Sequence, residues 1–207
     1  MNKVFGMIAI LLALVNSALC ASDFTVEEKQ TIQKVFDLSA PRRIEVDNLH
    51  GSIHVEGYDG HEVQLVAHQT IAAESKEKLQ EARQEVRLDI SQKDNRLFLY
   101  VDGPFRCHCS NGSMNFRGWR HYGYKVSFDF ELKVPRDTGV SLRTVDDGQI
   151  KVENISGDYD VENINGGIEM VEVAGSGRVY ALNGRVKVVF SRNPRSASSF
   201  GSLNGRV

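Results

Sequence analysis

A glycine recurs every nine residues in the second half of the chain, and this spacing constrains the fold more than any other feature. The series runs through Gly148, Gly157, Gly166, Gly175 and Gly184. Apolar residues follow these glycines at a fixed offset of four positions, at Val152, Val161, Met170, Val179 and Val188. A short alternating strand followed by a glycine turn, repeated at constant spacing, is typical of stacked β units.

Two nine-residue units make an eighteen-residue rung, a length that suits a narrow two-sided β-solenoid or β-roll. The turns fit this interpretation, because Asn and Gly tolerate positive φ and stand together at Asn165-Gly166, Asn183-Gly184 and Asn204-Gly205. The same pairs are strong hairpin signals, so an antiparallel meander is the alternative. We favour the solenoid because like residues fall at like positions and would stack into one continuous apolar ladder.

The first half of the chain also predicts strands, together with a single helix. The stretch GSIHVEGYDG repeats the unit once, with Gly51 and Gly60 nine residues apart. The stretch Tyr122 to Val134 alternates as one long strand and is stopped by Pro135. Only ESKEKLQEARQE has the thin apolar stripe of a helix. The predicted fold class is therefore all-β: a β-solenoid of nine-residue strand-turn units with one short helix.

The N-terminus has the pattern of a secretory signal peptide: MNK, then the apolar run VFGMIAILLALV, then the small residues of NSALCAS. We expect cleavage of residues 1–21, which leaves residues 22–207 as one domain without a transmembrane segment. A lipid anchor on Cys20 is an alternative, although Leu19 is large for that signal. A retained membrane helix would need about 20 apolar residues. The predicted location is the periplasm, the cell surface or the medium.

Charge and motifs exclude several classes of function. The chain carries 25 Lys and Arg against 27 Asp and Glu. A general binder of nucleic acid would need a basic excess. The sequence also lacks G-x-S-x-G, H-E-x-x-H and a phosphate-binding loop. We therefore predict no enzyme activity, no cofactor and no nucleic-acid partner.

The most unusual segment is the irregular loop from residue 103 to residue 124, which interleaves aromatic residues with arginines. Aromatic faces can stack on sugar rings, and arginine forks can pair with carboxylates or phosphates. An alternative is a cap that folds over an open end of the β structure and buries these rings. The predicted ligand-binding residues are Arg106, Phe116, Arg117, Trp119, Arg120 and Tyr122.

Cys107 and Cys109 lie in the same loop, separated by one residue. In an oxidising compartment we predict a disulfide, either local or between chains. Unpaired thiols are one alternative, and a metal site with His108 and His121 is another. The Cys-x-Cys spacing lacks the two-residue gap of structural zinc knuckles, so no metal site is predicted.

Two further groups of polar residues have ordinary explanations. The histidines are expected at the surface of strands, at His50, His54, His61 and His68. A set of acidic residues lacks the G-G-x-G-x-D pattern of calcium-binding repeats and is expected on a solvated face. That set comprises Asp146, Asp147, Asp158, Asp160 and Glu162.

The chain resembles the bacterial putative-adhesin domain family, a group of exported β-solenoid envelope proteins of unknown function. The resemblance covers residues 24–207 and rests on RRIEVDNLHGSIHVEGYDGHEVQLVA and on ELKVPRDTGVSLRTVDDGQIKVENISGDYDVENINGGIEM. It implies surface attachment and carries over no catalytic residue. After Val189 the segment FSRNPRSASSF departs from the nine-residue spacing.

These observations predict a non-enzymatic protein of the cell envelope that binds or scaffolds, with envelope polysaccharide or another envelope protein as partner. An accessory protein of an envelope-stress sensing system is one alternative, and a carbohydrate-active β-helix enzyme is a weaker one. The last residues, SLNGRV, copy ALNGRV at residues 181–186 without the strand that follows there. This predicts a truncated C-terminus or an exposed β-edge at which chains could pair into an oligomer.

Overall fold

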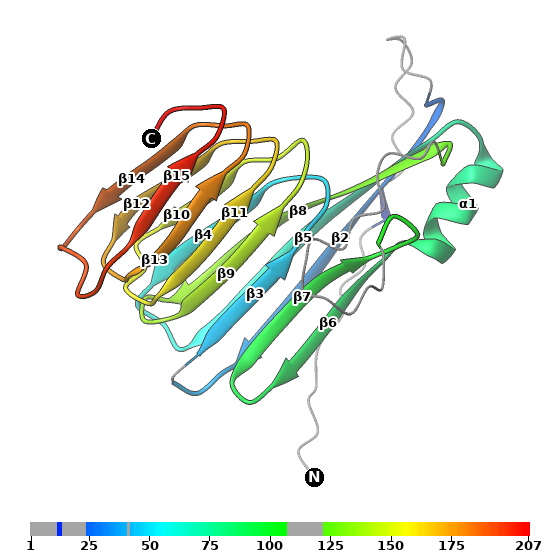
Figure 1. Ribbon diagram of the computed structural model, residues 1–207. Helices are drawn as coiled ribbons and strands as arrows, with labels where there is room; N and C mark the ends of the chain where they lie inside the picture. The colour runs from blue at the N-terminus through cyan, green and yellow to red at the C-terminus, as the bar shows by residue number, and fades with distance from the viewer. Residues whose placement is uncertain (1–11, 14–23, 41, 107–121) are drawn as a thin grey trace.

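The computed structural model describes residues 12–13, 24–40, 42–106 and 122–207, which form two β-sheets and one helix (Figure 1). The prediction of an all-β protein with one short helix is confirmed, whereas the prediction of a β-solenoid is wrong. Within the described residues no helix has the length and apolar character needed to cross a bilayer.

The strands belong to two sheets, which we call the eight-stranded and the seven-stranded sheet. The eight-stranded sheet has the order β1 (Leu12–Ala13), β2 (Val26–Asp37), β5 (Glu62–Ala73), β8 (Tyr124–Pro135), β4 (Ile53–Tyr58), β10 (Ile150–Glu153), β12 (Ile168–Val173), β14 (Val186–Phe190). The seven-stranded sheet has the order β15 (Ser199–Ser202), β13 (Gly177–Ala181), β11 (Tyr159–Asn163), β9 (Gly139–Thr144), β3 (Arg43–Asp47), β7 (Arg96–Asp102), β6 (Arg87–Lys93).

Both sheets are open and mix parallel with antiparallel pairs, which is the finding that overturns the solenoid prediction. The long strands β2, β5 and β8 pair antiparallel, as do β6 and β7. The meander alternative is also wrong for the second half, because the pairs that link β9, β11, β13 and β15 are parallel, as are those that link β10, β12 and β14. Glycine spacing is a local signal: it indicates where the chain turns, whereas pairing is decided by residues far apart in sequence.

The expected single apolar ladder divides between the two sheets. Val152 lies opposite Met170, which lies opposite Val188, in the eight-stranded sheet. Val161 lies opposite Val179 in the seven-stranded sheet. The chain therefore crosses from one sheet to the other at each turn, and paired residues are two units apart rather than one.

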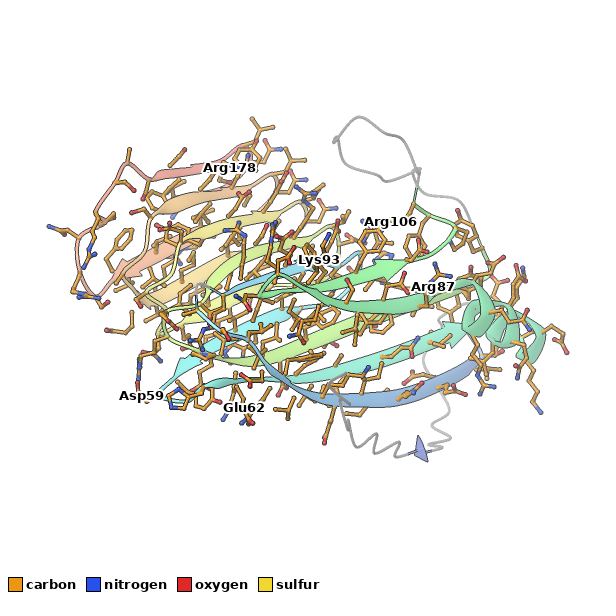
Figure 2. All side chains as sticks on the ribbon, turned by 90° about the horizontal axis from the view of Figure 1, so that it is seen from below. Asp59, Glu62, Arg87, Lys93, Arg106 and Arg178 are labelled. Atoms are coloured by element: carbon orange, nitrogen blue, oxygen red, sulfur yellow. The ribbon has the colours of Figure 1, made fainter. Side chains whose placement is uncertain are left out.

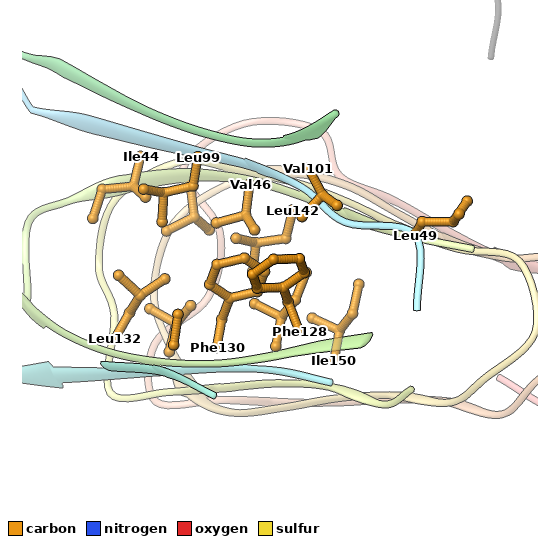
Figure 3. Packing of buried hydrophobic residues seen from close by; sticks show 14 of the residues in the cluster. Ile44, Val46, Leu49, Leu99, Val101, Phe128, Phe130, Leu132, Leu142 and Ile150 are labelled. Carbon is orange, nitrogen blue, oxygen red and sulfur yellow. The ribbon is translucent and has the colours of Figure 1, made fainter. Parts of the chain in front are cut away.

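The core lies between the sheets, which face each other as two layers (Figure 3). Ile44, Leu99 and Leu142 extend from the seven-stranded sheet toward Phe128 and Phe130 of the eight-stranded sheet. All five side chains are at most 1% exposed. Burial of each such side chain stabilises the fold by about 1.5–3 kcal/mol, so this layer is the main source of stability.

The helix α1 (Lys76–Glu85) follows β5 and lies at the end of the molecule opposite β14 (Figure 1). Ser75 is its N-cap, and the Ser75 hydroxyl accepts a hydrogen bond from the Lys78 amide. Leu79 and Ala82 are buried against the sheet, so the helix covers this end of the core.

Buried polar side chains bind the carbonyl groups of the glycine turns along one edge of the core. Asn48 donates to the Gly51 carbonyl, and Thr144 donates to the same oxygen. Asn163 occupies the next position along and donates to the Gly148 carbonyl at 2.9 Å. These bonds satisfy turn carbonyls that would otherwise be buried without a donor.

Candidate functional site

Most of the predicted loop residues lie outside the described part of the chain. They are the ligand-binding residues Phe116, Arg117, Trp119 and Arg120, the cysteines Cys107 and Cys109, and the histidines His108 and His121. All but two residues of the predicted signal peptide also lie outside it. The ligand, disulfide and cleavage assignments therefore stay predictions, whereas Arg106 and Tyr122 can be placed.

Arg106 is held tightly at the point where the loop leaves the seven-stranded sheet. Its Nε donates to the Val101 carbonyl at 2.9 Å, and Nη1 donates to Asp47 Oδ1 at 2.9 Å. Nη2 donates to the Asp47 carbonyl at 3.1 Å, and the guanidinium carbon lies 4.6 Å from the centre of the Tyr100 ring. The side chain is only 4% exposed. These contacts hold the Arg106 side chain against Asp47 and Tyr100, on the side of β3 and β7 that faces away from the core, where it anchors the start of the loop.

Tyr122 and Tyr124 anchor the other end of the loop. The Tyr122 hydroxyl donates to the Pro104 carbonyl at 3.3 Å, which joins the two ends. The centres of the two tyrosine rings are 5.8 Å apart, and the Tyr124 hydroxyl donates to the Glu85 carboxylate of α1. Burial, followed by this carboxylate, raises the pKa of the Tyr124 phenol far above its ordinary value. Tyr124 is therefore a neutral donor throughout the physiological pH range.

Beside this anchor, the seven-stranded sheet presents aromatic side chains on its outer face. Phe98 and Tyr100 are partly exposed, because their neighbours in β7 alternate toward the core. The Arg96 guanidinium lies 5.3 Å from the centre of the Phe98 ring and pairs with the Glu45 carboxylate of β3. We call Phe98, Tyr100, Arg96, Glu45 and Asp47 the outer aromatic face.

Farther along the same sheet the outward side chains form cross-strand ion pairs. Arg178 Nε lies 3.2 Å from Asp160 Oδ1, and Arg143 Nη2 lies 3.3 Å from Glu162 Oε2. Figure 2 shows Arg178 near the C-terminal strands and Arg106 near β7. Asp160 lies on a solvated face as expected, with a side chain that is 44% exposed, whereas the Glu162 side chain is only 17% exposed.

Among the described residues, one group of three side chains has ligand types suited to a metal ion: His50, Asp146 and Asp147. His50 Nδ1 lies 3.6 Å from Asp146 Oδ2, and the Lys125 ammonium pairs with Asp147. Burial, and next the charge of Lys125, hold the pKa of His50 below its ordinary value. His50 is buried rather than at the surface, because its bridge to Asp146 places it at a corner between strands. The Lys125 ammonium therefore already neutralises part of the negative charge of this cluster.

The other two strand histidines lie on the outer face of the eight-stranded sheet, as expected. His54 Nε2 is 2.8 Å from Glu153 Oε2, and the His54 side chain is 40% exposed. His68 Nδ1 is 3.1 Å from the Thr31 hydroxyl. Each imidazole therefore has a polar partner on a neighbouring strand.

The end of the molecule formed by β14 and β15 carries a hollow of about 510 Å³. Its lining is apolar at Val186, Val188, Phe190 and Phe200, and basic at Arg185, Lys187 and Arg206. Sequence reasoning predicted an exposed edge here but no basic site. The signal was available, because none of the 27 acidic residues lies after Glu172.

No protein-family model matches the chain, and no curated protein matches its sequence. Solved structures give remote similarity. A putative cell adhesion protein from Clostridium sporogenes is 10% identical, with a TM-score of 0.37 over 87% of this chain and 100% of that one. A putative adhesin from Bacteroides fragilis is 10% identical, with a TM-score of 0.22 over 86% and 97%. A putative lipid binding protein from Parabacteroides distasonis is 11% identical, with a TM-score of 0.26 over 86% and 96%. Similarity at this level assigns neither a family nor a function.

Proposed function

We propose that the protein is a non-enzymatic binding protein of the cell envelope, exported by its N-terminal leader, that recognises envelope polysaccharide. The binding site would be the outer aromatic face together with the adjoining loop 103–124. The observation that carries this proposal is the position of Phe98 and Tyr100, both partly exposed, on the outer side of one strand, next to the residues that anchor the loop.

The chemistry of this face suits sugars. Alternate residues on one side of a strand are about 7 Å apart, so one extended saccharide chain can contact both rings. Aromatic rings offer flat apolar surfaces for the carbon–hydrogen faces of sugars. The Arg96 guanidinium and the Glu45 carboxylate stand beside Phe98 and can bond to hydroxyl groups or to acidic substituents.

The arrangement of carboxylates supports binding rather than catalysis. Glycoside hydrolysis uses two carboxyl groups about 5–9.5 Å apart across a substrate groove. On the outer aromatic face, Glu45 pairs with Arg96 and Asp47 pairs with Arg106. In four surface hollows of the described chain, the lining includes one carboxylate at most.

The test is a pull-down of purified protein on envelope polysaccharide and on peptidoglycan. We expect Phe98→Ala combined with Trp119→Ala to weaken binding by about tenfold or more, which corresponds to about 1.4 kcal/mol. The matched control is Tyr58→Ala, which truncates a partly exposed aromatic residue of the eight-stranded sheet. Unchanged binding by the double variant, with an intact circular dichroism spectrum, would rule out this site.

Export is tested separately by cell fractionation and by the N-terminal sequence of the mature protein. We expect the chain outside the cytoplasm, starting near residue 21 or 22. Non-reducing gels of the same fractions show whether Cys107 and Cys109 link two chains. Retention of the full-length chain in the cytoplasm would contradict the proposed location.

A further inference from the structure

A single row of outward side chains crosses the seven-stranded sheet in register. Asp47 of β3 lies opposite Tyr100 of β7 on one side and opposite Arg143 of β9 on the other. Glu162 of β11 lies opposite Arg143, and Tyr180 of β13 lies opposite Glu162. We call these five residues the tyrosine row. The residues on either side of each in the chain are buried, so the row lies on the outer face of the sheet.

The tyrosine row has an aromatic ring at each end. Its end strands β7 and β13 are four strand spacings apart in the sheet (Figure 1), or about 19 Å. At one end, Phe98 stands beside Tyr100 in β7. At the other end, the Tyr180 ring lies against Gly201 of β15, where a Cβ would be only 3.2 Å from Tyr180 Cδ2. The small size of Gly201 therefore leaves room for the ring beside the next strand.

The main chain beneath the tyrosine row is already fully paired. Each of the strands β7, β3, β9, β11 and β13 lies between two neighbours in the sheet. A polypeptide that binds by adding a strand needs a free strand edge, which this part of the sheet does not offer. A ligand on the row is therefore recognised by side chains alone.

The charges on this face are balanced. Asp47 pairs with Arg106, and Glu162 Oε2 lies 3.3 Å from Arg143 Nη2 and 3.4 Å from Arg178 Nη2. A polyanion gains little from a surface without net charge, whereas paired guanidinium and carboxylate groups still offer fixed donors and acceptors to hydroxyl groups. On the outer side of these strands, five acidic residues stand against five arginines: Glu45, Asp47, Asp102, Asp160 and Glu162 against Arg43, Arg96, Arg106, Arg143 and Arg178.

We propose that the polysaccharide is a neutral, linear glycan that runs across the strands along the tyrosine row, from Tyr100 to Tyr180. This inference rests on the proposed function and adds the class of sugar and the direction of the chain. One pyranose unit of an extended glycan advances by nearly the spacing between strands, so about four units span the row. The tyrosine rings contact the carbon–hydrogen faces of the outer sugars, and the ion pairs between them bond to hydroxyl groups.

The probes are the neutral and the acidic fractions of envelope polysaccharide, separated on an anion-exchange column. The full-length mature protein should retain the neutral fraction, and added salt should change that retention by less than about twofold. Fragments of the neutral fraction with two, four and six sugars are then titrated by calorimetry. We expect the affinity to rise by about tenfold or more between two and four sugars and by much less between four and six, because about four fill the row.

On the protein side, Tyr180→Ala should weaken binding of the six-sugar fragment by about tenfold or more. It should leave the affinity for the two-sugar fragment unchanged, because the β7 end of the row can hold that fragment alone. Tyr180→Phe keeps the ring and should bind the six-sugar fragment within about twofold of the native protein. The matched control is Tyr58→Ala, on the eight-stranded sheet, and circular dichroism confirms that each variant is folded.

Three results would overturn the proposal. The first is unchanged binding of the six-sugar fragment by Tyr180→Ala while Phe98→Ala with Trp119→Ala still weakens it; the path across the strands is then wrong and the proposed function stands. The second is retention of the acidic fraction alone, lost as salt is raised, which would contradict the neutral class of sugar. The third is a native protein that retains neither fraction, in which case the proposed function fails as well.

Discussion

Arg106 and Arg96 allow a matched test of how the loop 103–124 is anchored. Each guanidinium lies over an aromatic ring of β7, and each pairs with a carboxylate of β3. The two differ in burial, since the Arg106 side chain is 4% exposed and the Arg96 side chain is 48% exposed. We predict that Arg106→Ala destabilises the protein far more than Arg96→Ala.

The magnitude follows from what each substitution leaves behind. Arg106→Ala removes three hydrogen bonds and leaves the Asp47 carboxylate, which is 30% exposed, without its cation. Loss of one partner of a buried ion pair typically costs about 3–5 kcal/mol. Because Asp47 keeps partial access to water, we expect the lower value, about 3 kcal/mol. Arg96→Ala removes an exposed pair and should cost about 1 kcal/mol or less.

The assay is urea unfolding followed by far-ultraviolet circular dichroism, at one pH and one salt concentration. Combining Arg106→Ala with Asp47→Asn should recover part of the loss, since the uncompensated charge is then gone. A loss below about 1 kcal/mol for Arg106→Ala, equal to that for Arg96→Ala, would refute the anchoring role. In that case Arg106 would remain available for the ligand-binding role that the sequence predicts.

Three further predictions concern the interior and are all measured by urea unfolding. The pKa of folded His50 lies below its ordinary value of 6.5, so at acidic pH the unfolded chain binds a proton that the folded chain does not. The free energy of unfolding should therefore fall as pH drops below about 6.5, and His50→Gln should flatten that fall between pH 7.5 and 5.5. Ala181→Ser should stabilise the fold by about 1 kcal/mol, because a hydroxyl there can donate to the Gly166 carbonyl. Polar side chains at the equivalent positions of the neighbouring strands already donate to the Gly148 and Gly184 carbonyls. Gly166→Ala should lower the free energy of unfolding by about 2–3 kcal/mol, since its Cβ would lie 1.9 Å from the Gly148 carbonyl oxygen. Gly167→Ala should lower it by under about 1 kcal/mol, because its Cβ would lie 3.4 Å from the nearest atom. Equal losses in the two glycine variants, a destabilised Ala181→Ser protein, or an unaltered pH profile for His50→Gln would each contradict its prediction.

Local features of the fold could be predicted from sequence, because they depend on alternation and turn residues. The strand expected from Tyr122 to Val134 corresponds to β8, Tyr124–Pro135, and the expected helix corresponds to α1. Pairing could not be predicted, because β2, β5 and β8 associate across segments that contain other strands and the helix. The alternation in these strands is compatible with either direction of pairing.

In the candidate site, too, local features could be predicted from sequence, whereas contacts between distant residues could not. The destination of Arg106 depends on acceptors at Val101 and Asp47 that only the folded sheet brings together. Phe98 and Tyr100 are absent from the predicted ligand-binding residues, since alternation alone does not say which face an aromatic residue will occupy. The basic end after Glu172 could have been found by charge counting along the chain.

The crossing of the chain between sheets restricts how this protein can change in length. From β9 onward successive strands alternate between the two sheets, and parallel partners such as Ile150 and Ile168 are eighteen residues apart. A duplication or deletion of eighteen residues would return every later strand to its own sheet with its core positions intact. A change of nine residues would exchange the sheets for everything that follows. The turn between β14 and β15 is longer than the others, because Arg178 and Ser199 pair at a spacing of twenty-one residues instead of eighteen. The added residues stay in the turn, and the strands keep their register. Evolutionary variation in length should therefore occur in whole pairs of strands, and irregular insertions should be confined to the turns.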